Sequence, residues 1–283
     1  MDWQNDNGIF LPMLNDEARL DFYETAIARV ANGKTFADVG AGTGLLSYLA
    51  AKNGAKKVYA IERDLNRFNL LCKVIDSLNL AHIIEPIHAD FLTLNLVADY
   101  CVTETIGCDI FDEDILDIGK HAKQLGMIVI PERMELSLLV QKAHPIFYLS
   151  VREHTQNTFQ LSDRLSNFGN IVSNMIEIDH AKPLERNDFF PVSRALPEIK
   201  LEDLYTSPAI PFILGESYDH ISLTLPAEYA VDQALVNIVW EAKFENIIMN
   251  QKNTNWGNPS KRVVMPNKSM TFTYKDHRWW YNP

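Results

Sequence analysis

One stretch constrains this chain more than any other: Phe36 to Ser47, with the sequence FADVGAGTGLLS. An apolar run ends in three glycines at alternate positions, and a helical pattern follows, which predicts a buried strand, a tight turn and a helix. A second apolar run, Val58 to Glu62, comes next and ends in an acid. Strand, glycine turn, helix, strand and acid, in this order, are the layout of a nucleoside-binding site on a doubly wound parallel sheet.

The glycines decide what kind of ligand such a site would take. Gly40, Gly42 and Gly44 let the backbone come close to a ligand because no Cβ intervenes. Their G-x-G-x-G spacing differs from the G-x-G-x-x-G of dinucleotide sites, and the Lys-Ser or Lys-Thr of a phosphate-binding loop is missing. A turn that only packs a helix on a strand would need neither Asp38, just before the loop, nor Glu62. We therefore interpret the stretch as a cofactor site, with Glu62 as acceptor for a ribose diol.

This stretch resembles motif I of the class I S-adenosylmethionine-dependent methyltransferases, and Glu62 stands where that superfamily carries its ribose acid. The resemblance implies S-adenosyl-L-methionine as cofactor. Asp90 and Phe91 end the third predicted strand, where the acid could accept from the adenine amino group and the ring could lie against the purine. Asp90 could equally be a helix N-cap or a turn residue. Arg19 could match the cofactor carboxylate in a two-pronged geometry, the alternative being an exposed helical arginine.

Length and charge limit the class of protein. The chain has 283 residues, enough for two cores. Its net charge of −11 argues against a general nucleic-acid binder and is compatible with a basic substrate. An odd number of cysteines (three), a polar N-terminus and the lack of an apolar run of 18 residues predict a cytoplasmic protein with reduced thiols and no membrane contact.

Strands and helices alternate at short spacing in the first half, which predicts a mostly parallel sheet covered on both faces. We expect helices over residues 15–31, 45–53 and 66–80, and strands over residues 36–39, 58–62, 83–88, 99–103 and 127–130.

Two glutamates flank the loop that follows the fourth predicted strand. Glu104 stands at the carboxyl end of that strand, where ligands bind in open sheets of this type. Glu113 comes nine positions later, beyond Gly107, and is expected to open a helix. Two carboxylates on the arms of one loop can hold a guanidinium, whose donors form a planar fork. Glu113 could instead favour a helix N-terminus.

With these residues in place, the sequence resembles the protein arginine methyltransferases. Glu104 and Glu113 match the family's "double-E" loop, and residues 13–19 match its M-L-x-D-E-x-R helix. The resemblance implies that Arg19 meets the cofactor carboxylate and that Met13 lines the place where guanidinium and methyl group meet. It also implies a β-barrel-like second domain, a homodimer, and a helical dimerisation arm placed between residues 147 and 180.

The second half agrees with that resemblance. Short alternating runs separated by recurrent prolines, such as Ile221–Leu225 and Val236–Trp240, are typical of an antiparallel sandwich or barrel. Asn255 and Trp256 match the family's Thr-His-Trp loop, in which the histidine pairs with the acid at Asp16; asparagine can still form that hydrogen bond but cannot carry a proton. Trp256 could wall the substrate pocket or belong to the core. The family's aromatic lid is missing, and Ile115 replaces a second methionine of the site.

We therefore predict an α/β protein in three parts: an N-terminal helical segment that closes the cofactor site (1–33), a Rossmann-like S-adenosylmethionine-binding domain (34–131) and a β-barrel-like domain with an inserted dimerisation arm (132–283). The predicted function is methyl transfer to an arginine guanidinium of a protein or peptide. Two alternatives remain: a small-molecule N-methyltransferase acting on free arginine or another amine, and a catalytically silent scaffold subunit. A nucleic-acid methyltransferase is disfavoured by the net charge and by Thr103-Glu104-Thr105-Ile106 in place of an Asn/Asp-Pro-Pro-Tyr/Phe motif.

Overall fold

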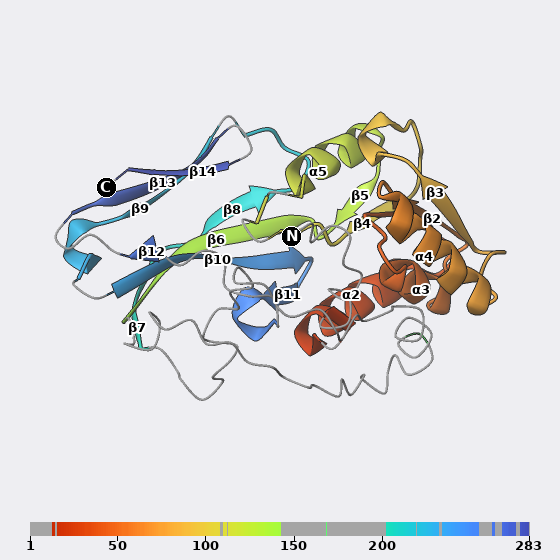
Figure 1. The fold of residues 1–283 in the computed structure, drawn as a ribbon, viewed down its shortest axis with the longest axis horizontal. Helices are drawn as coiled ribbons and strands as arrows, with labels where there is room; N and C mark the ends of the chain where they lie inside the picture. Colours follow the sequence, from red (N-terminus) through yellow and green to blue (C-terminus); the bar gives the residue numbers. More distant parts are fainter. Residues whose placement is uncertain are drawn as a thin grey trace, which may run out of the picture.

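The structure is a computed structural model that describes residues 13–14, 16–107, 110–111, 113–142, 168, 202–218, 220–231, 234–254, 262–263, 268–275 and 278–282. The described residues form a parallel sheet with helices and, next to it, antiparallel sheets with few helices (Figure 1). The predicted fold class is therefore confirmed: a Rossmann-like α/β sheet followed by an antiparallel barrel or sandwich.

The parallel sheet has the strand order β3-β2-β1-β4-β5. Its strands are β1 (Thr35–Val39), β2 (Lys57–Glu62), β3 (Ile84–His88), β4 (Tyr100–Thr103) and β5 (Ile128–Ile130). The order reverses at β1, because β2 and β3 continue to one side and β4 and β5 to the other. A ligand crevice forms at such a reversal, outside the carboxyl ends of the strands.

Two of the helices of this half and its 3₁₀ turn begin at an aspartate that caps them. The helices are α2 (Glu17–Val30), α3 (Leu45–Lys52), α4 (Leu65–Ser77) and α5 (Ile115–Gln124), with a short 3₁₀ turn η3 (Phe91–Thr93). Asp16, Asp64 and Asp90 cap α2, α4 and η3 by accepting a backbone N–H with the side chain. Right-handed crossovers place α3 and α4 on the opposite face of the sheet from α5 (Figure 1).

The named strands of the second half pair antiparallel in the part that the structure describes. One sheet is built around the long strands β6 (Arg133–Lys142) and β10 (Ala234–Phe244), and a smaller one has the order β14-β13-β9. The remaining elements are β7 (Asp203–Thr206), β8 (Ile210–Ile213), β9 (Ile221–Leu225), η6 (Ala227–Tyr229), β11 (Ile247–Asn250), η7 (Gln251–Asn253), β12 (Arg262–Val263), β13 (Met270–Lys275) and β14 (Arg278–Asn282).

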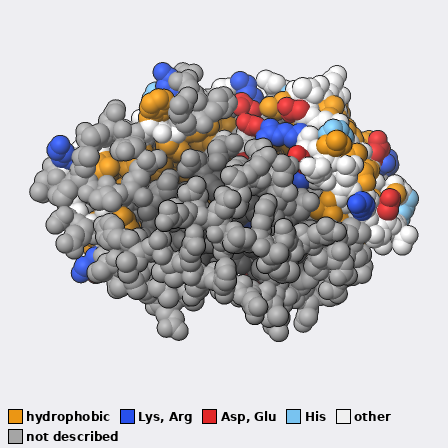
Figure 2. All heavy atoms as spheres, viewed as in Figure 1, with side chains coloured by type: hydrophobic (Ala, Val, Ile, Leu, Met, Phe, Trp, Pro, Cys, Tyr) orange, Lys and Arg blue, Asp and Glu red, His pale blue; other side chains and the backbone are white. Residues whose placement is uncertain are grey.

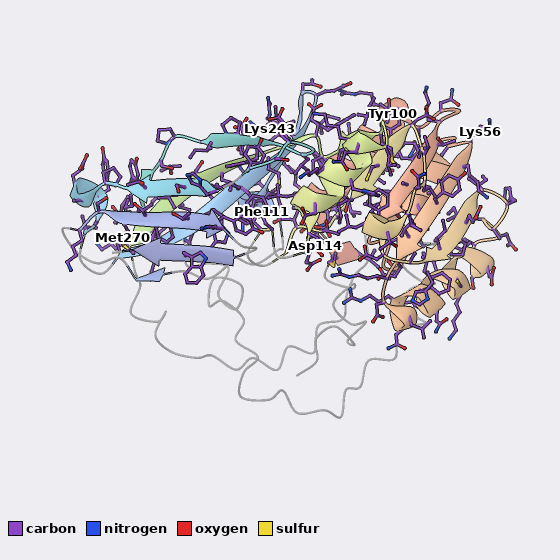
Figure 3. All side chains as sticks on the ribbon, turned by 90° about the horizontal axis from the view of Figure 1, so that it is seen from above. Lys56, Tyr100, Phe111, Asp114, Lys243 and Met270 are labelled. Atoms are coloured by element: carbon purple, nitrogen blue, oxygen red, sulfur yellow. The ribbon has the colours of Figure 1, made fainter. Side chains whose placement is uncertain are left out.

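The loop between β4 and α5 is one of the places where the two halves meet, α2 and the turn after β10 being another. Phe111 of this loop is buried among aromatic rings of the antiparallel half, with centroids 4.9 Å from Tyr274, 6.1 Å from Phe212 and 6.3 Å from Trp279. Figure 3 shows Phe111 and Asp114 at the junction, between Tyr100 of the parallel sheet and Met270 of the antiparallel one. The shape of this loop therefore depends on both halves.

Several expectations need adjustment. Glu113 does not open α5: it lies in a turn, and the helix begins at Ile115 after Asp114, whose φ is +64°. Cys101 is buried as predicted, whereas Cys72 is only half-buried. The predicted dimerisation arm lies outside the described residues except for Phe168, which is buried and packs on Tyr48 with a centroid distance of 5.1 Å. Among the described helices, none has the length and apolarity needed to cross a bilayer.

Candidate active site

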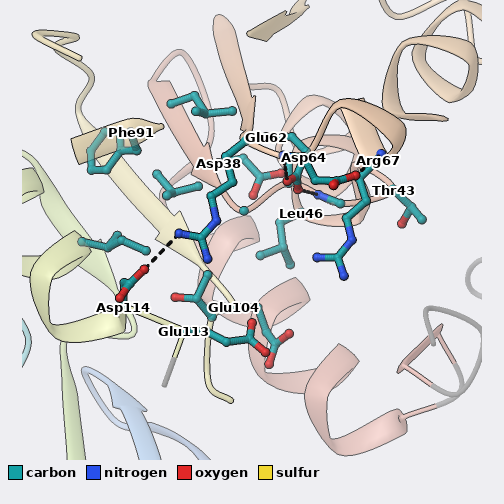
Figure 4. A pocket seen from close by; sticks show the side chains of 18 of the residues that line it. Asp38, Thr43, Leu46, Glu62, Asp64, Arg67, Phe91, Glu104, Glu113 and Asp114 are labelled. Atoms are coloured by element: carbon teal, nitrogen blue, oxygen red, sulfur yellow. Dashed lines mark hydrogen bonds and ion pairs between the residues drawn. The ribbon is translucent and has the colours of Figure 1, made fainter. Parts of the chain in front are cut away.

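A cavity of about 470 Å³ opens at the carboxyl ends of β1, β2 and β4. This volume lies within the range of small-molecule sites. The cavity is lined by most of the predicted site residues together with several others (Figure 4): Met13, Arg19, Asp38, Gly40, Gly42, Glu62, Arg63, Asp64, Arg67, Asp90, Phe91, Glu104, Thr105, Glu113, Asp114 and Ile118.

The glycine loop has the conformation that its sequence predicts. Gly40, Gly42 and Gly44 all have positive φ, at +73°, +53° and +84°, which glycine adopts without steric cost. A Cβ on Gly40 would lie 2.8 Å from Cγ2 of Thr105, so this glycine also makes room for the neighbouring strand end. The N–H groups of Gly40 and Ala41 donate to the carbonyl of Ile61 at 3.0 Å, which fastens the loop to β2.

Asp38, just before the loop, fixes it to the helix that follows. Its Oδ2 accepts from the hydroxyl of Ser47 at 2.6 Å and from the backbone N–H of Ser47 at 2.8 Å, which ties the end of β1 to the start of α3. Its Oδ1 is buried and has no hydrogen-bond partner among the described residues, although the residue lines the cavity. Burial raises the pKa of Asp38 to about 7, against the lowering effect of the two Ser47 bonds. An orphaned acceptor of this kind is satisfied when a ligand supplies a donor.

Glu62 is oriented by backbone donors from two loops. Its Oε2 accepts from the N–H of Gly42 at 3.0 Å, and its Oε1 accepts from the N–H of Asp64 at 2.9 Å. The residue is 4% exposed and lines the cavity. Because each carboxylate oxygen has two lone pairs, Glu62 can still accept from the vicinal hydroxyls of a ribose.

Arg19 belongs to the pocket and is not an exposed helical arginine. It is 3% exposed and lies between two acids: its Nη1 is 3.4 Å from Oε2 of Glu104, and its Nε is 3.9 Å from Oδ2 of Asp16. Asp16, 1% exposed, also caps α2 by accepting from the N–H of Arg19 at 3.2 Å. A buried guanidinium in this position can receive one more carboxylate from a ligand, since it carries five donors.

Glu104 and Glu113 converge as predicted. Both line the cavity, and Figure 4 shows them next to each other on the side away from Glu62 and Arg67. Burial raises the pKa of Glu104 to about 7; the Arg19 guanidinium opposes this, and the nearby Glu113 adds to it. Two carboxylates this close repel each other, so a planar cation between them would be stabilised.

The other predicted residues that the structure describes fall on the same cavity, whereas Gly44 of the glycine loop is not among its lining residues. Asp90 and Phe91 line it beyond β3, where Oδ1 of Asp90 caps η3 by accepting from Leu92 N–H and the Phe91 ring packs edge-on against His121. Met13 lines it from the segment before α2. Asn255 and Trp256 lie outside the described residues. Asp90 therefore acts as an N-cap through Oδ1. Its Oδ2 can accept from a ligand at the same time.

Comparison with known proteins finds similarity in sequence and in fold. No protein-family model matches the chain. Over 118 residues it is 34% identical to protein arginine N-methyltransferase 9 of Homo sapiens, covering 39% of this chain and 14% of that protein. Over 119 residues it is 37% identical to protein arginine N-methyltransferase 1 of Caenorhabditis elegans, covering 39% of this chain and 34% of that protein. The chain thus covers well under two thirds of the length of these two relatives.

The similarity in fold extends much further. A Trypanosoma brucei PRMT1 enzyme–prozyme heterotetrameric complex with AdoHcy superposes with a TM-score of 0.62 at 17% identity, over 97% of this chain and 89% of that one. A crystal structure titled PRMT6-SAH superposes with a TM-score of 0.61 at 17% identity, over 98% of this chain and 99% of that one.

This chain is similar to the protein arginine methyltransferases. The likeness to solved protein arginine methyltransferases over nearly its whole length confirms the two-part fold, and the sequence matches confirm the predicted resemblance.

Within this protein arginine methyltransferase-like pocket, some lining residues were not singled out from the sequence. Arg63 directly follows Glu62 and pairs with Asp114, which directly follows Glu113: Nη1 and Oδ2 are 3.0 Å apart. Arg67 lines the pocket one helical turn later. In the sequence, Arg63 and Asp114 each stand next to a predicted site acid. That position alone does not tell whether their side chains point into the pocket.

Proposed function

We propose that this protein is an S-adenosylmethionine-dependent methyltransferase that acts on an arginine guanidinium in a protein or peptide. The observation that carries the proposal is the convergence of Glu104 and Glu113 in the cavity that also holds the glycine loop and Glu62. One cavity thus offers acceptors for a nucleoside at one end and paired carboxylates for a planar cation at the other (Figure 4).

The donors and acceptors of the pocket fit the cofactor. Glu62 would accept from the ribose hydroxyls, and Arg19 would pair with the carboxylate of the methionine part. The unpartnered Oδ1 of Asp38, and the positive φ of Gly40 and Gly42 in the lining of the cavity, support a ligand in contact with the loop. When bound, S-adenosylmethionine would supply an electrophilic methyl group and, once its bond between sulfur and methyl carbon breaks, leave as S-adenosylhomocysteine.

The residues of the chain would then position the acceptor and handle its charge. Glu104 and Glu113 hold the guanidinium from two sides and draw its positive charge toward the nitrogens that they contact, so that the remaining nitrogen faces the methyl carbon. Alignment of two bound reactants supplies much of the rate. The guanidinium loses a proton as the methyl group is gained, and Glu104, with its raised pKa, is the acceptor that we assign to that proton.

The test is transfer from methyl-labelled S-adenosylmethionine to an arginine-rich peptide, to proteins of a cell lysate and to free arginine, with products identified by mass. We expect label on arginine of peptide or protein. Label on free arginine would favour the small-molecule alternative, and cofactor binding without any label would favour the silent subunit.

A matched pair of variants localises the chemistry. Glu104→Gln should reduce transfer by more than roughly a hundredfold while changing cofactor affinity by less than about threefold, since the amide no longer attracts the guanidinium. Glu85→Gln, an equivalent change at an exposed acid on β3, is the control. Full activity of Glu104→Gln would contradict the assignment.

Assembly and compartment are part of the same proposal. We propose a homodimer in the cytoplasm that binds neither nucleic acid nor membrane. Figure 2 shows basic and acidic side chains interspersed on the visible part of the described surface. A nucleic-acid binder would need a mainly basic face instead. Light scattering coupled to gel filtration measures the oligomeric state directly.

A further inference from the structure

Arg63 and Asp114 form an ion pair that the proposed reaction does not use. Their atoms Nη1 and Oδ2 are 3.0 Å apart, and both residues line the cavity. The dashed line that ends at Asp114 in Figure 4 marks this pair. Each residue follows a proposed functional acid, Glu62 in one loop and Glu113 in the other.

The pair joins two loops that the sheet keeps apart. Arg63 follows β2 and Asp114 precedes α5, which is reached from β4, whereas β1 lies between β2 and β4. Neighbouring strands are about 4.8 Å apart, so strand ends separated by one strand are roughly 10 Å apart. An extended arginine and an aspartate together span this gap. The ion pair therefore crosses the end of β1, from which the glycine loop departs.

The conformation of Asp114 indicates that its carboxylate pairs with Arg63 and does not cap its own helix. Asp114 is the N-cap residue of α5, a position where aspartate usually accepts a backbone N–H of the first turn. Here it makes no capping hydrogen bond, and its φ of +64° is in the left-handed region. The carboxylate points to Arg63 instead.

The backbone of Arg63 is fixed although its side chain is exposed. Its carbonyl lies 3.1 Å from Nε2 of His88, and Glu62 holds the next N–H, that of Asp64. The Arg63 side chain is 62% exposed and that of Asp114 is 34% exposed. A guanidinium on a fixed backbone and a flexible stem can close over a ligand and release it without rearranging the loop.

We propose that Arg63, held in place by Asp114, is a further cofactor-contacting residue that closes the nucleoside end of the pocket and slows the departure of the cofactor. The inference rests on the proposed function, because it takes Glu62, Asp90 and Phe91 as the nucleoside end. The planar guanidinium can lie against a purine face while its edge stays bound to the carboxylate, an arrangement that a lysine ammonium does not reproduce.

The experiment measures binding and dissociation of S-adenosylhomocysteine, by calorimetry and stopped-flow displacement. Arg63→Ala and Asp114→Ala should each raise the dissociation rate roughly three- to tenfold, with a matching rise in Kd and a small change in the association rate. The exchanged double variant Arg63→Asp with Asp114→Arg should recover part of the loss. Lys57→Ala is the control, since its 2.9 Å pair with Glu85 joins the amino-terminal parts of β2 and β3, away from the pocket.

Salt provides an independent readout. An exposed pair is screened by ions, so the wild-type dissociation rate should rise between roughly 0.05 M and roughly 0.5 M salt, whereas that of Arg63→Ala should change less. Unchanged melting temperatures would exclude a general loss of structure in the variants.

The outcomes separate the two proposals. Binding of S-adenosylhomocysteine by the wild type, with unchanged dissociation in both single variants, would overturn the inference and leave the proposed function standing. Absence of binding by the wild type would overturn both. Faster dissociation in the single variants, with recovery in the exchanged variant, supports the inference.

Discussion

The guanidinium of Arg19 and the carboxylate of Glu104 face each other inside the pocket, with Nη1 3.4 Å from Oε2 and side-chain exposures of 4% and 10%. Arg19 comes from α2 and Glu104 from the end of β4, 85 positions later in the chain. In the proposed reaction the first residue serves the cofactor and the second the substrate. Arrival of a cofactor carboxylate at Arg19 would weaken its hold on Glu104, which favours binding of the cofactor before the guanidinium.

Substitution of Arg19 tests this relationship. Arg19→Ala should weaken binding of S-adenosylhomocysteine about ten- to a hundredfold, because a carboxylate loses its charged partner in a buried site. Arg19→Lys should fall between the wild type and alanine, since a point charge replaces the two-pronged donor. Arg29→Ala, at a half-exposed arginine of the same helix, should bind normally. Calorimetric titration measures all four proteins, and equal affinities would refute the role.

The raised pKa of Glu104 predicts a pH dependence of activity. The carboxylate must be ionised to hold the guanidinium, so kcat/KM should rise as the pH passes through about 7 and reach a plateau above it. Glu113 contributes to the raised pKa of Glu104. Glu113→Gln should therefore shift the residual activity profile to lower pH, besides lowering its height. A profile with the same midpoint in both proteins would contradict the proposed coupling.

The same group predicts the direction of a stability change. Burial raises the pKa of Glu104 from its ordinary value of 4.5 to about 7, so the folded state binds more protons than the unfolded state between these pH values. The free energy of unfolding contributed by Glu104 then falls as the pH rises through this window and is constant above it. Urea titrations at about pH 5 and about pH 8 should show this fall, and it should be smaller in Glu104→Gln.

The packing of Phe111 against aromatic rings of the antiparallel half predicts that this half affects catalysis. Phe111→Leu keeps an apolar side chain but loses the ring contacts that fix the loop bearing Glu113, so kcat/KM for peptide should fall about tenfold or more. Cofactor affinity should stay within roughly twofold. Phe36→Leu, at a buried ring in the amino-terminal half of β1, loses comparable volume away from the pocket and is the control. Equal losses of activity in both variants would mean that Phe111 acts through general stability.

Substitutions at two glycines distinguish the cost of backbone strain from the cost of a steric clash. Gly33→Ala introduces a Cβ at φ +71° with no atom within 4 Å, so it should cost about 1 kcal/mol of stability. Gly40→Ala has nearly the same φ but places the Cβ 2.8 Å from Cγ2 of Thr105, so it should cost more and should weaken cofactor binding. Adding Thr105→Ser, which removes that methyl group, should recover part of the difference. Denaturant unfolding gives the stabilities, and equal costs at both glycines would contradict the clash.

The sequence by itself determined the parallel half in nearly all its elements. Apolar runs, glycines and caps are local signals, and they placed β1 to β5 and α2 to α4 within a few residues, because chain direction, turn chemistry and hydrophobic period act over short distances. The glycine loop and Glu62 followed from the same signals. Resemblance to a family supplied Arg19, Glu104 and Glu113 as a set.

The tertiary structure decided what these residues contact. Phe111 contacts aromatic rings more than 100 positions later in the chain and so anchors the loop that carries Glu113 to the antiparallel half; that contact has no local signature. The left-handed turn at Asp114 moved the start of α5 past Glu113 and turned the carboxylate toward Arg63. Side-chain direction, burial and the resulting pKa of Glu104 arise from packing between distant segments, and periodicity along the chain does not contain that information.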